Sequence, residues 1–164
     1  SLIVSSAITT TILALGGAGD DILVGGGGNN VLVGGAGTDL ISGRGARDVL
    51  IGGEGSDALS GSGGQDILVD GTTANDGDEA ALLAILAEWT SKKPIDERIA
   101  NLVENGVGED EDIFLDDTTV TDDEETDKYF GYYGRDWYLD FEGDKIAWKS
   151  IFDRYGLAGD KKNA

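Results

Sequence analysis

The sequence contains no cysteine, no histidine and no methionine, and only one proline. Without Cys and His, the chain lacks the usual ligands of zinc and haem and can form neither a reactive thiol site nor a Ser-His-Asp triad. Because methionine is missing at the first position as well, we expect a piece of a longer protein. No cleavable signal peptide is visible, and no apolar run is long enough to span a bilayer, so we expect no membrane insertion.

Basic residues are also scarce. The chain has 12 Lys and Arg against 32 Asp and Glu, which gives a net charge of -20. Since there is no basic stripe, we expect no nucleic-acid partner, and cations are the natural complement of such a chain. A length of 164 residues allows one domain with a modest core, or a repeat array with an appendage.

Glycine, by contrast, is abundant and regularly spaced. From Gly16 the chain repeats every nine residues without a gap, as GGAGDDILV, GGGGNNVLV, GGAGTDLIS, GRGARDVLI, GGEGSDALS and GSGGQDILV. Column six of this alignment contains Asp21, Asn30, Asp39, Asp48, Asp57 and Asp66. Column eight contains Leu23, Leu32, Ile41, Leu50, Leu59 and Leu68. A disordered Gly/Asp linker would not keep its acids and aliphatic residues in phase, so the pattern favours a folded repeat.

Each half of the unit has a physical role. Glycines at columns one, two and four allow positive φ angles and turn carbonyl groups inward, and the last three residues suit a very short strand. Turn and strand in alternation predict a solenoid. A row of aspartates in close proximity needs a cation, and flexible oxygen ligands suit calcium better than magnesium.

The units resemble the RTX, or hemolysin-type, calcium-binding repeat, GGxGxDxUx, where U is a large aliphatic residue. The resemblance implies a parallel β-roll with two repeats per turn and about four or more calcium ions, each held between column six of one repeat and column six of the repeat two further on. The implied pairs are Asp21 with Asp39, Asn30 with Asp48, Asp39 with Asp57 and Asp48 with Asp66, with a possible further site between Asp57 and Asn75 or Asp76.

The resemblance also implies carbonyl ligands from columns two and four of the first repeat of a pair and from columns one and three of the second. The predicted metal ligands are Gly17, Gly19, Asp21, Gly26, Gly28, Asn30, Gly34, Gly35, Ala36, Gly37, Asp39, Gly43, Arg44, Gly45, Ala46, Asp48, Gly52, Gly53, Glu54, Gly55, Asp57, Gly61, Gly63, Asp66, Asn75, Asp76, Asp127 and Asp136. Asn30 removes one charge, so its site should be weaker. Ala46 must adopt the backbone angles that glycine adopts elsewhere.

The nine-residue period stops after Val69, and a helical pattern begins. The segment DEAALLAILAEWT and a second segment from Pro94 to Asn105-Gly106 predict a helical hairpin over residues 78–108. Outward-facing columns seven and nine are wholly apolar in the even-numbered repeats, at Val31, Val33, Val49, Ile51, Ile67 and Val69. We expect the hairpin to cover this even face, or a partner chain or self-association to do so if it stays uncovered.

Residues 109–164 predict an acidic, degenerate continuation of the roll and a C-terminal cap. The unit GYYGRDWYL from Gly131 places Asp136 at column six, and the nine residues before it place Asp127 there. The runs 109–112 and 122–125 are either further calcium ligands or solvated loops, and 144–155 could form a final helix. Residues 1–15 predict capping strands at the other end.

The sequence thus predicts a mainly β fold, a parallel β-roll over residues 16–77 with an inserted helical hairpin and an aromatic C-terminal cap. The predicted function is calcium binding that drives folding of a secreted or surface-exposed bacterial protein, with the rest of the parent polypeptide as its partner, and the resemblance implies type I export of the unfolded chain. The alternative is a carbohydrate-binding or adhesive module with Tyr132, Tyr133, Trp137 and Tyr138 as a platform. Nothing in the sequence favours an enzyme.

Overall fold

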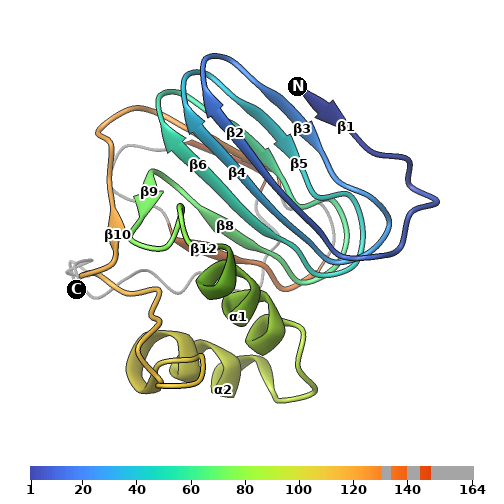
Figure 1. Ribbon diagram of the computed structural model, residues 1–164. Helices are drawn as coiled ribbons and strands as arrows, with labels where there is room; N and C mark the ends of the chain where they lie inside the picture. The colour runs from blue at the N-terminus through green and yellow to red at the C-terminus, as the bar shows by residue number, and fades with distance from the viewer. Residues whose placement is uncertain (131–133, 140–144, 149–164) are drawn as a thin grey trace.

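The computed structural model describes residues 1–130, 134–139 and 145–148 (Figure 1). Two parallel sheets face each other, and the chain passes from one to the other with every repeat. The odd sheet, named for the first, third and fifth repeats, contains β1 (Leu2–Ile3), β3 (Ile22–Val24), β5 (Leu40–Ser42), β7 (Ala58–Ser60), β11 (Lys128–Phe130) and β13 (Lys145–Trp148). The even sheet contains β2 (Ile12–Ala18), β4 (Asn30–Ala36), β6 (Val49–Glu54), β8 (Ile67–Val69) and β12 (Trp137–Leu139). This is the parallel β-roll that the repeat predicts, with two repeats in each turn.

Column eight fills the interior of the roll. Leu23 aligns with Ile41 on the odd sheet, and Leu32 aligns with Leu50 on the even sheet, so equivalent columns stack from turn to turn. Successive side chains of a strand point to opposite faces, and column eight therefore points inward while columns seven and nine point outward. The inner core cluster consists of Leu23, Leu32, Ile41, Leu50, Leu59, Leu68, Tyr129 and Tyr138.

A helical segment covers the outer face of the even sheet. It comprises α1 (Glu79–Trp89), α2 (Ile95–Ala100) and the π-helical turn η1 (Asn101–Asn105), and α1 lies against the sheet (Figure 1). The six apolar residues of the even face belong to one buried cluster with Leu82, Ile85, Leu86 and Trp89 of α1. This confirms that the helices bury the even face, which is therefore not open for self-association. None of the described helices is long and apolar enough to cross a membrane.

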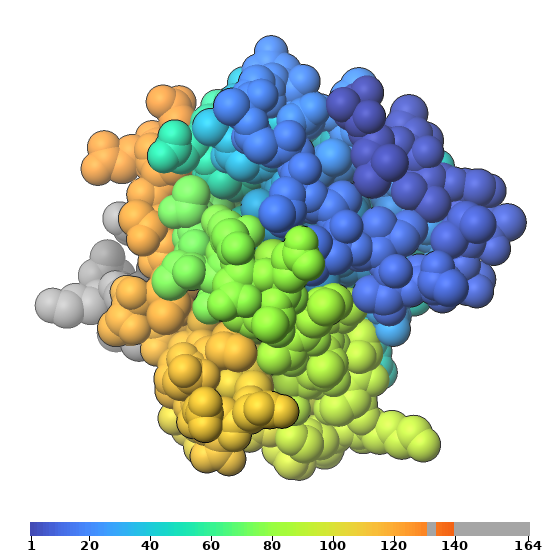
Figure 2. Space-filling view, viewed as in Figure 1, coloured from blue at the N-terminus to red at the C-terminus, as the bar shows by residue number. Residues whose placement is uncertain are grey.

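Two capping features of the helical segment follow from its sequence. Asp78 is the N-cap of α1, and its side chain accepts hydrogen bonds from the backbone N–H groups of Ala80 and Ala81. The η1 turn ends at Gly106, which takes a φ of 77°, a backbone conformation that favours glycine. In the space-filling view, roll and helical segment form one continuous surface (Figure 2).

The helical segment is inserted inside a turn of the roll, between the even strand β8 and the odd strand β11. The short strands β9 (Thr72–Thr73) and β10 (Val120–Thr121) pair in antiparallel fashion and bring the two ends of the insertion together. Beyond it, β11 pairs with β7 and β12 pairs with β8, so the roll continues as though the insertion were absent. An insertion whose ends lie side by side is compatible with an undisturbed scaffold.

The two ends of the chain differ in part from the expectation. At the N-terminal end, β1 and β2 add one strand to each sheet by pairing with β3 and β4. Near the C-terminal end, the predicted helix over 144–155 is wrong for its described part, because β13 pairs with β11 as a further strand; the rest of that prediction lies outside the described residues. Tyr129 and Tyr138 take the column-eight positions of β11 and β12, with their rings 5.7 Å apart in an edge-to-face contact.

Candidate metal centre

The turns stack so closely that their backbone leaves no room for side chains at several columns. A Cβ atom on Gly35 would lie 2.0 Å from the carbonyl oxygen of Gly17, and one on Gly53 would lie 1.9 Å from that of Gly35. Both glycines have φ near 108°, in the region that other residues rarely enter. Arg44 and Ala46 adopt φ angles of 77° and 75°, so Ala46 takes the conformation that the sequence demands of it.

The column-six aspartates form two ladders, one along each edge of the roll. The Oδ1 atom of Asp39 accepts the backbone N–H of Asp21 at 2.7 Å, and Oδ1 of Asp57 accepts that of Asp39 at 2.7 Å. On the other edge, Oδ1 of Asp66 accepts the N–H of Asp48 at 2.9 Å. Each carboxylate is therefore fixed against the residue one turn earlier, with one oxygen committed to that bond.

The second oxygen of each carboxylate has no such partner. Among the described residues, none donates a hydrogen bond to Oδ2 of Asp39, Asp48, Asp57 or Asp66, although all four atoms are buried. Buried polar atoms are nearly always satisfied in folded proteins, and an exception requires an explanation. A cation bound at these oxygens supplies one.

At Asp39 and Asp21, a backbone carbonyl of the next turn converges on the same place as the carboxylate oxygen Oδ2. A Cβ atom built on Gly34 would meet Oδ2 of Asp39 at 2.3 Å and the carbonyl oxygen of Gly52 at 2.4 Å. A Cβ atom built on Gly16 would lie 2.4 Å from the carbonyl oxygen of Gly34 and 2.9 Å from Oδ2 of Asp21. Two acceptors thus face each other across adjacent turns, which is the arrangement of a cation site. The sequence alone gave no steric reason for glycine at column one; the structure supplies it.

Burial makes the negative charge of these aspartates costly. Desolvation, which is the main cause, raises the pKa of Asp48 to about 7. Desolvation and the nearby charges of Asp48 and Asp136 raise the pKa of Asp66 to about 8. Desolvation, with smaller contributions from Asp127, Asp39 and Asp123, raises the pKa of Asp57 to about 7. A positive ion between the turns removes this penalty.

The oxygen-only donor set fits calcium. Carboxylate and carbonyl oxygens in a row of backbone turns are hard ligands, and Ca²⁺ accepts six to eight of them in flexible geometry. The described turns offer neither sulfur nor imidazole, which zinc and copper prefer.

The insertion changes one predicted pairing. The residue above Asp57 is Asp127, whose Oδ1 accepts the N–H of Asp57 at 2.7 Å, and not Asn75 or Asp76. Asn75 instead donates from Nδ2 to the carbonyl oxygen of Phe114, and Asp76 accepts from the hydroxyl of Thr73. Asn75 and Asp76 lie at the start of the insertion, because the chain leaves the roll at this point and rejoins it near residue 122.

Asp66 is stacked in the same way beneath the last even level. The Oδ1 atom of Asp136 accepts its N–H at 3.0 Å. In both ladders the sequence offset across the insertion is 70 residues, compared with 18 elsewhere. Both ladders therefore continue on the far side of the insertion. Asp127 extends the odd ladder by one level, and Asp136 extends the even ladder by one level.

One acidic cluster lies outside the ladders. Carboxylate oxygens of Asp70, Asp122 and Asp123 come within 4.8 Å of one another where the chain leaves and rejoins the roll. Asp70 was not among the predicted ligands, although its position directly after the sixth repeat makes it column one of the interrupted seventh. Asp123 also accepts the backbone N–H of Gly55, which fixes the rejoining chain to the turn below.

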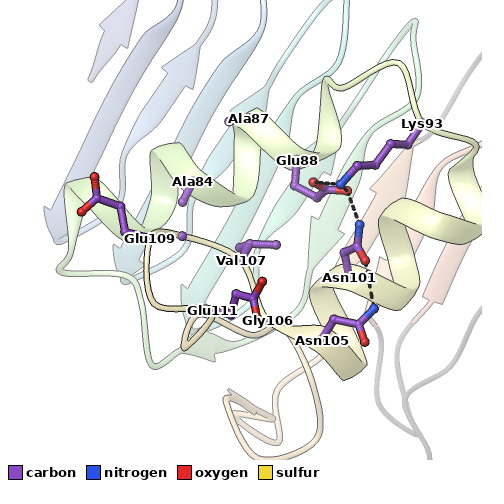
Figure 3. Close-up of a pocket in the computed structure, with 11 residues that line it drawn as sticks. Ala84, Ala87, Glu88, Lys93, Asn101, Asn105, Gly106, Val107, Glu109 and Glu111 are labelled. Carbon is purple, nitrogen blue, oxygen red and sulfur yellow. Dashed lines mark hydrogen bonds and ion pairs between the residues drawn. The ribbon is translucent and has the colours of Figure 1, made fainter.

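A groove between α1 and the segment after η1 shows no comparable convergence of free polar groups. Figure 3 shows that four of its polar residues, Glu88, Lys93, Asn101 and Asn105, bind one another. The Glu88 carboxylate accepts from Lys93 Nζ at 2.9 Å and from Asn101 Nδ2 at 2.8 Å, and Asn101 Oδ1 accepts from Asn105 Nδ2 at 2.9 Å. These bonds connect α1 to the loop that follows it and to η1, and they serve the packing of the insertion.

A parallel roll with ladders of buried aspartates, each with one carboxylate oxygen that lacks a hydrogen-bond donor, belongs to the class of calcium-binding β-solenoids. Comparison with family profiles gives the particular family: residues 15–49 and 33–68 each match the RTX calcium-binding nonapeptide repeat in four copies. Residues 15–68 are thus RTX calcium-binding repeats, and calcium is the ion that this part of the chain binds. No curated protein and no solved structure showed a significant match to the chain.

Proposed function

We propose that this chain is a calcium-triggered folding unit of a larger bacterial protein that is exported unfolded by a type I system. The observation that carries the proposal is the set of buried Oδ2 atoms without a hydrogen-bond donor, on carboxylates that their Oδ1 atoms fix to the turn before; at Asp39 a carbonyl oxygen of the next turn lies at the same place. Without a cation these contacts between adjacent turns are repulsive. Binding energy is then folding energy, as in small metallodomains.

The ions would lie between successive column-six residues, together with turn carbonyls. The proposed pairs are Asp21 with Asp39, Asp39 with Asp57, Asp48 with Asp66, Asp57 with Asp127 and Asp66 with Asp136. Dissociation constants on the order of 10⁻⁴–10⁻³ M are typical of extracellular calcium modules. Such sites stay empty where calcium is scarce inside a cell and fill outside it, which suits a secreted or surface-exposed location and passage of an unfolded chain.

The role of the roll is structural and metal-binding, without catalysis of its own. The adhesive alternative loses support because Trp137 and Tyr138 are only 2% and 6% exposed. Their rings pack in the two cores and present no sugar platform. Tyr132 and Tyr133 lie outside the described residues.

Calorimetric titration with calcium, followed by far-ultraviolet circular dichroism, tests the proposal. We expect β signal to appear with calcium binding and to be lost in chelator. Asp66→Asn should lower the number of bound ions, whereas Glu97→Gln, which removes an exposed carboxylate from α2, should leave it unchanged. Absence of binding up to about 10 mM, an order of magnitude above the weakest affinities of extracellular modules, contradicts the proposal. A full β signal in chelator contradicts the folding switch.

A further inference from the structure

Asn30 occupies a column-six position in the even ladder and is fully buried. Its backbone N–H donates to Oδ1 of Asp48 at 2.7 Å, as the aspartates do at the other levels. The strand residue aligned with it on the earlier turn is Ile12, which offers no carboxylate. Asn30 is therefore the first polar residue of the even ladder, and it carries no charge.

The amide nitrogen of Asn30 takes the place that the free carboxylate oxygen takes elsewhere. A Cβ atom on Gly25 would meet Nδ2 of Asn30 at 2.7 Å, just as one on Gly43 would meet Oδ2 of Asp48 at 2.2 Å. In the aspartate repeats this position presents an acceptor, which at Asp21 and Asp39 faces a carbonyl oxygen of the next turn. In the second repeat it presents a donor.

That donor bonds the oxygens of two adjacent turns. Nδ2 of Asn30 donates to the carbonyl oxygen of Gly28 at 2.7 Å, to Oδ1 of Asp48 at 2.8 Å and to the carbonyl oxygen of Gly43 at 3.1 Å. Its own Oδ1 accepts the backbone N–H of Gly26. The opposite orientation of the amide would place Oδ1 against three oxygens, so the contacts fix which atom is nitrogen.

We propose that the Asn30 carboxamide replaces a cation at this level, so that the second and fourth repeats are joined without metal. This inference rests on the proposed function of the other levels and is an alternative to the weak calcium site predicted at Asn30. Two amide hydrogens shared among three oxygens satisfy the acceptors that a calcium ion satisfies elsewhere. The even ladder thus begins with a level that does not depend on calcium.

The number of bound ions distinguishes this arrangement from a weak site. We would count calcium by non-denaturing mass spectrometry and calorimetry at saturating calcium for the full chain, Asn30→Asp, Asn30→Ala and Asn29→Asp. Asn30→Asp should bind one ion more than the unmodified chain, because it restores the carboxylate. Asn29→Asp makes the same charge change one residue away, where the side chain accepts the N–H of Arg47, and should add none.

Asn30→Ala should bind the same number of ions as the unmodified chain, but melt at a temperature lower by roughly 2–10 °C in saturating calcium, because three buried oxygens lose their donor. Equal ion counts for Asn30→Asp and the unmodified chain overturn the inference, as does an extra ion in Asn29→Asp or a lost ion in Asn30→Ala. If the unmodified chain binds several ions while one of these results holds, only the role of Asn30 fails. If it binds none, the proposed function fails as well.

Discussion

In the absence of calcium, acid should replace the cation and fold the roll. The raised pKa values of Asp48 and Asp66, about 7 and about 8, mean that both carboxyls take up protons when the roll forms below these pH values. In the unfolded chain both titrate near the ordinary value of 3.8. A group whose pKa is raised by folding destabilises the folded state above its folded pKa, and this penalty disappears as the pH falls toward the unfolded pKa.

The size of the effect follows from the two shifts. At about 1.4 kcal/mol per pKa unit, the full penalties at high pH are of order 4 kcal/mol for Asp48 and 6 kcal/mol for Asp66, as upper limits. Their sum is comparable with the whole stability of a small domain, about 5–15 kcal/mol. Lowering the pH from 8 to 5 in chelator should therefore produce a substantial part of the calcium-dependent β signal, with most of the change between pH 8 and 6.

The assay is circular dichroism in chelator across this pH range, with sedimentation velocity to show that the chain remains monomeric. High salt at pH 8 is the control for general charge repulsion, because salt screens exposed charges but leaves the desolvation penalty of buried ones in place. The variant Asp48→Asn/Asp66→Asn carries neutral amides and should show a smaller dependence on pH. An unfolded chain at pH 5, or an equal response to salt at pH 8, would refute the reasoning.

Two further substitutions test the turn and the insertion. Gly43→Ala places a Cβ atom 2.2 Å from Oδ2 of Asp48 and should weaken calcium binding at that level roughly 10-fold in a calorimetric titration. Gly45→Ala, which meets no atom within 4 Å, should leave it unchanged; equal effects would contradict the steric role. Trp89→Ala should lower the unfolding free energy in saturating calcium by about 3–5 kcal/mol in urea denaturation, because the indole is fully buried. Trp89→Phe should lower the unfolding free energy by about 1–3 kcal/mol, because it removes the hydrogen bond from Nε1 to the Gln65 carbonyl but keeps an aromatic ring. A loss as large as that of Trp89→Ala would contradict a separate contribution from ring packing.

The repeat itself could be predicted from the sequence because its information is local. Columns six and eight recur every nine residues, and strand alternation then places Leu32 inside and Val31 outside without further assumption. The apolar even face also indicated that another apolar element, the helical segment, had to cover it. These inferences needed only the period and the polarity of each column.

The split turn could not be predicted in the same way. Asp70 and Asp127 belong to one interrupted turn, but the residues that join its two parts, Thr72–Thr73 and Val120–Thr121, form only a two-residue antiparallel ladder without a sequence signature. A period search looks at the next nine residues and therefore offered Asn75 and Asp76 as the continuation. The hydrogen bonds of Asn30 could not be predicted for a related reason, since the residue type shows a lost charge but not the three acceptors that surround the side chain.

The position of the insertion links helix formation to the ladders. Helix α1 packs its apolar side against β4, β6, β8 and β12 of the even sheet, and an isolated helix of 11 residues is marginal in water. Strands β4, β6 and β8 are held together on one edge by the Asn30, Asp48 and Asp66 ladder. Arg98 adds a second connection, because it donates to the carbonyl oxygen of Trp89 and to the side chain of Gln65 in the adjoining turn. The helices therefore depend on the order of the calcium-binding turns, and their formation should follow calcium binding although they contribute no residue to the ladders.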